Sequence, residues 1–186
     1  MTPGEFAELI RRRSAEIERA YADRWPRMMR KEATEHFRDG FRNGGFVDTS
    51  FERWDATRRQ TVPFNGAEGK YSPLNSRTGD LMHSIDGRTE PGAVVMFSTS
   101  GHAKFHNEGA EATVTPRMRG YFWARHSESK QRYGKENAET RFWKNMALTR
   151  KSRIRIPKRR FMGRSEALMK RIYDVILKDL KRLLNN

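Results

Sequence analysis

Residues 153–184, RIRIPKRRFMGRSEALMKRIYDVILKDLKRLL, combine the two patterns that decide the fold class. Ile and Arg alternate over 153–156 before Pro157, which is typical of a short strand that buries its Ile face and ends at the proline. Beyond it, an apolar stripe with steps of three and four predicts a helix over about 164–184. The stripe consists of Leu168, Ile172, Val175, Ile176, Leu180, Leu183 and Leu184. A strand followed by a long amphipathic helix indicates an α+β fold.

Two further segments in the middle of the chain have the composition of strands. Residues 93–97 (AVVMF) form a short apolar and β-branched run, and residues 112–115 (ATVT) end at Pro116. Together with residues 153–156 they predict a small, mostly antiparallel sheet within residues 78–163. Residues 120–149 interrupt this sheet core as a long polar insertion, which we expect to be partly helical.

Residues 1–45 have the periodicity of helices. Apolar residues recur on one face over about 4–22, Pro26 is expected to interrupt or restart the helix, and a second helix runs to about Phe41. The Gly44-Gly45 pair is expected to end it, because glycine is favoured just beyond a helix C-terminus. We therefore expect the sheet to be packed by these N-terminal helices and by the long C-terminal helix.

Residues 46–77 show no sustained period. Trp54 and Phe64 stand as isolated aromatic residues in a polar background. A structureless loop of that length is unusual inside a compact domain, so we expect an extended arm that is ordered by another subunit. With the last helix assigned to residues 164–186, we interpret residues 1–186 as a single domain.

The composition is polar for a chain of 186 residues, with 35% hydrophobic and 33% charged residues. We expect a modest core together with segments that become ordered on assembly. The absence of cysteine excludes disulfides, thiolate metal sites and a cysteine nucleophile. No stretch approaches the ~20 apolar residues of a membrane span, and the first residues lack the apolar run of a signal peptide. We therefore expect assembly in a cytosol and no membrane partner.

The formal net charge of +15 predicts an anionic partner. The densest basic run surrounds the predicted strand at 153–156, and it supplies Arg150, Lys151, Arg153, Arg155, Lys158, Arg159 and Arg160. Such a run can contact nucleic-acid phosphates without reading sequence, or it can dock on an acidic protein surface. The sequence does not favour one over the other, and it contains no helix-turn-helix or zinc-finger pattern.

Catalytic and metal chemistry find little support in the sequence. His102, His106 and Glu108 are close enough along the chain to be considered as metal ligands of a nuclease or a zincin. A zincin requires Glu directly after the first His, however, and Ala103 stands there. No Ser lies in a G-x-S-x-G context, and no glycine-rich loop ends in Gly-Lys-Ser/Thr. We predict no catalytic residues, no metal, no cofactor and no enzymatic activity.

Three short segments resemble motifs of the phage virion morphogenesis (tail-completion) family. Residues 78–85 (TGDLMHSI) resemble its TG-x-L-x-x-SI element, residues 103–109 (AKFHNEG) its YA-x-x-H-x-x-G segment, and residues 156–163 (IPKRRFMG) its IP-x-R-x-F-L/I-G element. Residues 41–48 (FRNGGFVD), Trp54, residues 116–118 and residues 122–124 are similar to the variant found in Mu-like prophages. Order and spacing match over about 35–185. Gly101-His102 departs from the pattern, because many members carry an aromatic residue there.

The resemblance implies a structural subunit of a tailed-phage particle without catalytic activity. It would form an oligomeric ring at the head–tail junction or the tail end, in a neck, tail-completion or tail-terminator role. The partners would be further copies of itself, head-completion or connector proteins, tail-tube or tail-terminator proteins, and genomic DNA that passes through the ring. The location would be the virion, after assembly in the host cytoplasm.

Most residues of these motifs are expected to be scaffold. Gly79 and Gly109 would adopt positive φ, Leu81 and Ile85 would pack a short helix on the sheet, and Phe161 would anchor the entry to the last helix. The complete set is Thr78, Gly79, Leu81, Ser84, Ile85, His106, Glu108, Gly109, Pro157 and Phe161.

Aromatic residues without an evident partner in the chain are the predicted anchors of the subunit interface. They are Phe46, Trp54, Phe64, Trp123 and Trp143. The main alternative to a ring subunit is a basic nucleic-acid-binding protein without catalysis. A metal-dependent nuclease that uses His102, His106 and Glu108 is the third hypothesis.

Overall fold

The computed structural model describes residues 1–61 and 70–185, and Phe64 lies outside them. Within this part of the chain the α+β class is confirmed. Helices predominate, and three two-stranded antiparallel sheets pack against them.

The N-terminal residues form one continuous helical rod. It consists of α1 (Pro3–Arg19), a π-helical turn η1 (Ala20–Arg24) and α2 (Trp25–Asn43). Thr2 and Glu5 form a capping box at its start. Pro26 has no N–H to give to the preceding turn, and the chain accommodates it with a wider turn in which the Trp25 amide donates to the Ala20 carbonyl. The expected interruption at Pro26 is therefore a π-helical bulge within the rod.

The rod ends at Gly44, whose φ of 72° is the left-handed conformation expected there. The chain then turns back through a hairpin of β1 (Gly45–Val47) and β2 (Phe51–Arg53), and the short helix α3 (Arg58–Thr61) follows. The prediction of an extended arm beginning at residue 46 is thus wrong for this stretch. The hairpin lies on the chain's own core, because Phe46 and Trp54 pack there.

Aromatic rings form the centre of that core. Phe41 of α2 contacts Trp54 with ring centroids 5.4 Å apart and Phe161 at 5.2 Å, both edge to face. The indole Nε1 of Trp54 donates to the carbonyl of Arg160 at 2.8 Å, so the polar end of the ring is also satisfied. The buried residues of the cluster are Ala33, Phe37, Phe41, Phe46, Trp54, Ile85, Phe161 and Leu168.

The strands in the middle of the chain belong to two separate two-stranded sheets instead of one sheet. After α4 (Asp80–His83), β3 (Ile85–Glu90) pairs with β4 (Ala93–Ser98), and this hairpin packs against α2. After α5 (Ala103–Glu108), β5 (Ala110–Thr113) pairs with β6 (Arg153–Ile156). The strand at 153–156 ends at Pro157 as predicted, with Arg153 and Arg155 exposed and both Ile residues half-buried.

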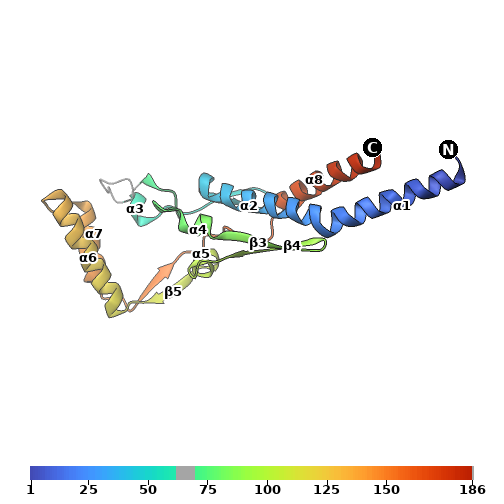
Figure 1. The fold of residues 1–186 in the computed structure, drawn as a ribbon. Helices are drawn as coiled ribbons and strands as arrows, with labels where there is room; N and C mark the ends of the chain where they lie inside the picture. Colours follow the sequence, from blue (N-terminus) through green and yellow to red (C-terminus); the bar gives the residue numbers. More distant parts are fainter. Residues whose placement is uncertain (62–69, 186) are drawn as a thin grey trace.

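The insertion between β5 and β6 is a helical hairpin. Helices α6 (Pro116–Tyr133) and α7 (Ala138–Ala147) are joined by a short turn at Gly134, and they contact each other along their length. Thr115 and Asn137 cap the two N-termini with side-chain hydrogen bonds. The hairpin stands at the end of the β5–β6 pair, away from the main core (Figure 1).

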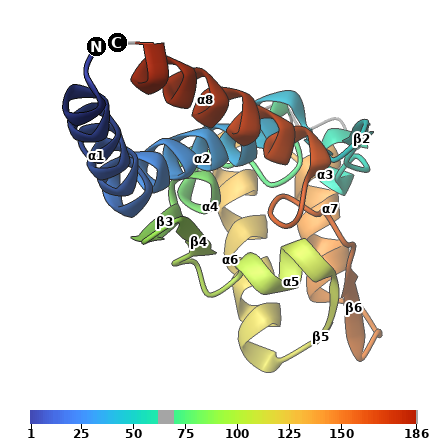
Figure 2. The same cartoon turned by 90° about the vertical axis from the view of Figure 1, so that its right-hand side faces the viewer.

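The last helix, α8 (Glu166–Asn185), packs on α2 and then runs beside α1. The outer ends of α1 and α8 consequently lie next to each other in both views (Figures 1 and 2). Ser165 links the start of α8 to β1, because its hydroxyl donates to the Val47 carbonyl at 2.8 Å and accepts from the Leu168 amide at 3.1 Å. The molecule is therefore elongated, with the α1–α8 helix pair at one end and the α6–α7 hairpin at the other (Figure 1).

Candidate functional site

The structure brings the family-like motifs together around α5 and the segment after β6. The Asn107 side-chain oxygen accepts from the backbone amides of Phe161 at 2.9 Å and Met162 at 3.0 Å. The Arg159 amide donates to the His106 carbonyl at 2.8 Å. Two motifs that are about 50 positions apart along the chain thus form one backbone-bonded unit. Sequence reasoning missed Asn107, although it lies inside the 103–109 motif.

The expected scaffold geometry is present at several motif residues. Gly79 and Gly109 have φ of 66° and 79°, as predicted. Ile85 and Phe161 are fully buried in the core, and Leu81 packs against it. Among the remaining motif residues, the Ser84 hydroxyl donates to the Leu81 carbonyl at 2.7 Å, and the Thr78 hydroxyl lies 3.1 Å from that of Ser76. Glu108 is exposed.

Two members of the predicted basic surface make contacts within the fold. Arg159 is 7% exposed, and its guanidinium donates to the Asp55 carbonyl at 3.0 and 3.2 Å. Arg160 pairs with Asp48 at 3.1 Å and lies over the Phe46 ring at 4.3 Å. The prediction that Arg159 faces a partner is wrong, because its buried guanidinium holds the segment after β2. Arg160 is partly exposed, so its predicted contact with a partner stays a prediction.

The other five basic residues remain on the surface. Arg153 forms an exposed ion pair with Glu111 at 3.2 Å across the β5–β6 pair. Arg150, Lys151, Arg155 and Lys158 are exposed and have no ion pair among the described residues. This smaller set keeps the choice between a nucleic-acid and an acidic protein partner open.

The predicted interface aromatics divide into core and surface residues. Phe46 is 2% exposed and Trp54 7%, so the prediction that they anchor a neighbouring subunit is wrong. Trp143 is half-buried inside the helical hairpin, with its ring centroid 5.0 Å from that of Phe142. Trp123 is 41% exposed on α6 and remains a candidate for an interface.

Exposed apolar residues occur in two sets, one on the α1–α8 helix pair and one on the α6–α7 hairpin. We call the first the helix-pair patch; it consists of Phe6 and Ile10 on α1, Met169 and Tyr173 in the first turns of α8, and Leu184 at the outer end of α8. The second, the hairpin patch, consists of Trp123 on α6 and Leu148 at the end of α7. Tyr121 is also exposed, but it is two residues from Trp123 on the helix and lies on another side of α6, against Trp143. Sequence reasoning missed Met169 and Tyr173. The sequence does indicate them, because the apolar residues of α8 cover more of the helix surface than the single stripe that packs on the core.

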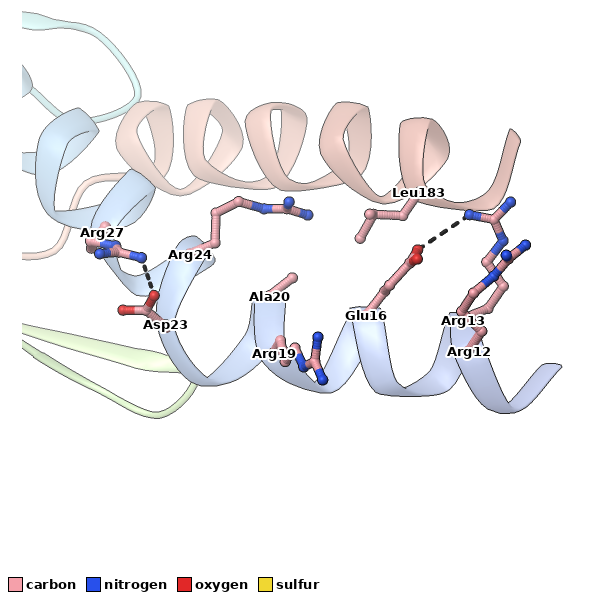
Figure 3. A pocket seen from close by; sticks show the side chains of 9 residues that line it. All are labelled: Arg12, Arg13, Glu16, Arg19, Ala20, Asp23, Arg24, Arg27 and Leu183. Carbon is pink, nitrogen blue, oxygen red and sulfur yellow. Dashed lines mark hydrogen bonds and ion pairs between the residues drawn. The ribbon is translucent and has the colours of Figure 1, made fainter. Parts of the chain in front are cut away.

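An arginine-lined groove separates α1 from α8. Its volume is about 670 Å³, and Arg24 extends from the rod toward α8 while Leu183 points down from it (Figure 3). Glu16 pairs with Arg13 at 3.2 Å and Asp23 pairs with Arg27, so part of the charge is neutralised within the groove. The lining residues are Arg12, Arg13, Glu16, Arg19, Ala20, Asp23, Arg24, Arg27 and Leu183.

A second basic cavity lies between the helical hairpin and the body, and His106 lines it. Burial lowers the pKa of His106, and the nearby charges of Arg159 and His102 lower it further. Its Nδ1 is buried and has no hydrogen-bond partner among the described residues. A neutral imidazole in this position could hydrogen-bond to a polar ligand.

Among the described residues, no three His, Asp or Glu side chains are grouped closely enough to hold a metal ion. His102 precedes α5, while His106 and Glu108 lie on it. The described helices include none that is long and apolar enough to cross a membrane.

Comparisons of the chain with protein-family models, with curated proteins and with solved structures found no match. The candidate site is therefore defined by its own geometry. It comprises two apolar patches, one on each helix pair, and basic clefts beside each of them.

Proposed function

We propose that this protein is a structural subunit of a tailed-phage particle that assembles into a ring at the head–tail junction or the tail end. The observation that carries the proposal is that exposed apolar residues occur on both the α1–α8 pair and the α6–α7 hairpin. These two helix pairs lie at opposite ends of an elongated chain (Figure 1). A ring needs a heterologous contact, in which one surface of each subunit meets a different surface of the next. Two different apolar surfaces, one on each helix pair, suit such a contact.

The phage identity rests on the motif resemblance at residues 78–85, 103–109 and 156–163. The mutual hydrogen bonds of the second and third segments, through Asn107 and His106, support a shared scaffold role for them. The proposed partners are further copies of the chain, head-completion or connector proteins, and tail-tube or tail-terminator proteins. The proposed location is the virion.

The proposal is tested by the mass of the purified protein over a range of concentrations. We expect closed assemblies for the wild type, and we expect Tyr173→Asp to reduce them strongly, because it places a charge in the helix-pair patch. Phe105→Asp is the matched control, since Phe105 is a similarly exposed aromatic residue on α5, outside both patches. A wild-type protein that stays monomeric at high concentration, alone and with particle components, would contradict the proposal.

A second candidate function is nucleic-acid binding without catalysis. The four exposed cations Arg150, Lys151, Arg155 and Lys158 favour it. Binding would be nonspecific and would weaken steeply as salt rises, because phosphate contacts release counterions. Tight duplex binding by a strictly monomeric protein, lost when these four residues are changed to Ser, would favour this function over the ring.

A further inference from the structure

A continuous cleft runs along the inner side of the helical hairpin. It consists of two cavities of about 630 and 730 Å³ that share Thr57, Arg58, Phe142 and Arg159. One wall is α7, the opposite wall is the segment from Asp55 to Arg58, and β6 borders the second cavity. We call it the hairpin cleft.

The lining of the hairpin cleft is strongly basic. Among the described residues that line it, Asp55 is the only acidic one, against Arg58, Arg77, Arg125, Lys151, Arg153, Arg155 and Arg159. Three of these cations are engaged within the chain: Arg125 with Glu128, Arg153 with Glu111, and Arg159 with the Asp55 carbonyl. Arg58, Arg77, Lys151 and Arg155 are exposed and have no acidic partner among the described residues. The cleft thus carries unneutralised positive charge and complements an anionic ligand.

Apolar side chains and a strand edge lie beside this charge. Phe142, Met146 and Ile154 line the second cavity. The Val114 amide donates to the Ser152 carbonyl at 2.8 Å, so these two residues form a hydrogen-bonded pair. Such pairs alternate along an antiparallel ladder, and the next ones are Ala112 with Ile154 and Ala110 with Ile156. The backbone N–H and C=O groups of Arg153 and Arg155 consequently point away from β5. Both residues line the cleft, so an extended chain could pair with this edge.

We propose that the hairpin cleft binds an extended acidic segment of a different protein of the particle. The segment would add to the free edge of β6, direct its carboxylates to Arg58, Lys151 and Arg155, and place apolar side chains on Phe142 and Met146. That the partner is a protein of the particle rests on the proposed function. That the bound segment is extended, acidic and partly apolar rests on the lining of the cleft alone. A second copy of this chain is a poor source, because its only acidic residues two positions apart, Glu16 and Glu18, lie within helix α1.

Nucleic acid fits the cleft less well than a peptide does. Cavities of about 630 and 730 Å³ accommodate side chains and an extended backbone, while a duplex would contact only the outer cations. The strand edge also offers alternating donors and acceptors, which a peptide backbone satisfies and a phosphate backbone does not.

The test is the binding of a short fluorescein-labelled peptide in which glutamate and leucine alternate, followed by fluorescence anisotropy at low protein concentration. Arg58→Glu/Lys151→Glu is the cleft variant. Arg150→Glu/Lys158→Glu is the matched control, because it makes the same charge change at exposed residues that do not line the cleft. All four residues are exposed, so the unfolding midpoints are expected to stay close to that of the wild type.

We expect the cleft variant to weaken peptide binding by about tenfold or more and the control to change it by about twofold or less. A peptide with serine in place of leucine keeps its charge and is expected to bind about tenfold more weakly, because it cannot use the apolar wall. Equal loss in both variants, or equal affinity for both peptides, would overturn the proposal. Cleft-dependent binding of a single-stranded oligonucleotide that exceeds peptide binding would also overturn it, in favour of nucleic acid.

The failure of this inference and the failure of the ring proposal can be told apart. Rings without cleft-dependent peptide binding contradict the acidic-segment proposal alone. Cleft-dependent peptide binding by a protein that never forms rings contradicts the ring proposal alone.

Discussion

The carboxylate of Asp179 on α8 accepts a hydrogen bond at 2.9 Å from the indole Nε1 of Trp25 at the start of α2. The two residues are 154 positions apart, and both are buried. Arg24 and Arg182 pair with the same carboxylate at 2.6 and 2.8 Å. Asp179 therefore fixes α8 to the rod next to the π-helical turn, and this contact orients the helix pair that carries one of the two apolar patches.

Replacing Asp179 by Ala should destabilise the fold by about 2–3 kcal/mol, because it leaves the Trp25 N–H and the Arg24 charge without their acceptor. The matched control is Asp174→Ala on the exposed side of α8, which should change stability by less than about 0.5 kcal/mol. Denaturant unfolding of both variants measures the difference. Equal stabilities for the two variants would show that the Asp179 contacts do not hold α8.

Gly109→Ala should cost about 1–3 kcal/mol, because its φ of 79° is unfavourable for any other residue and a Cβ would lie 3.0 Å from the Lys158 amide nitrogen. Gly120→Ala should act in the opposite direction, with a gain of up to about 1 kcal/mol. Gly120 is an exposed residue within α6, and a Cβ would meet no other atom within 4 Å. Thermal unfolding of the two variants compares them directly, and a destabilised Gly120→Ala would contradict the helical assignment of α6.

Asn107→Leu should destabilise by about 2–4 kcal/mol, since the amides of Phe161 and Met162 both lose their acceptor. Asn107→Asp keeps an oxygen in the same place and should retain most of the stability. Urea titration distinguishes the two variants. If leucine is tolerated as well as aspartate, the link between the 103–109 and 156–163 motifs does not rest on this side chain.

Stability should fall as pH decreases below the ordinary histidine pKa of about 6.5. Burial lowers the pKa of His36, although its hydrogen bond to the Val47 carbonyl partly opposes this; the charge of Arg171 lowers it further and that of Asp39 raises it. The unfolded state then takes up a proton at a pH where the folded state does not, so stability is lost through this window on acidification. The pKa of His106 is also lowered, so this residue contributes to the same loss of stability on acidification.

Unfolding at a series of pH values in wild type and His36→Gln measures this dependence. The glutamine can still donate to the Val47 carbonyl but does not titrate, so the loss of stability on acidification should be smaller in the variant. It should not vanish, because His106 still contributes. The same pH dependence in both proteins would contradict a lowered pKa at His36.

Local patterns predicted the helices and their ends well, because those features depend on neighbouring residues. The apolar steps of α8 and the glycines at 44, 79 and 109 express local conformational preferences, and the structure places them accordingly. Pairing between distant segments was harder to predict. Ala112 pairs with Ile154, and a whole helical hairpin lies between these two residues in the sequence, so no short-range pattern specifies their pairing.

The errors at Phe46, Trp54 and Arg159 have one physical cause. In sequence they are aromatic residues in a segment without a sustained apolar period and an arginine within a basic run, both of which are typical of a surface. In the fold their partners come from a distant segment: Arg160 lies over the Phe46 ring, and its carbonyl accepts from the Trp54 indole. Such mutual burial becomes visible only when residues 46–55 and 159–161 are brought together.

The central claim is that two unlike apolar patches join neighbouring subunits head to tail. The most direct test mixes a variant impaired in the helix-pair patch, Tyr173→Asp, with one impaired in the hairpin patch, Trp123→Asp, and measures masses in solution. Each variant alone should stay monomeric, and the mixture should form a one-to-one dimer that grows no further, because each partner retains one intact patch. Homodimers of either variant alone, or a mixture that stays monomeric, would contradict head-to-tail assembly through these patches.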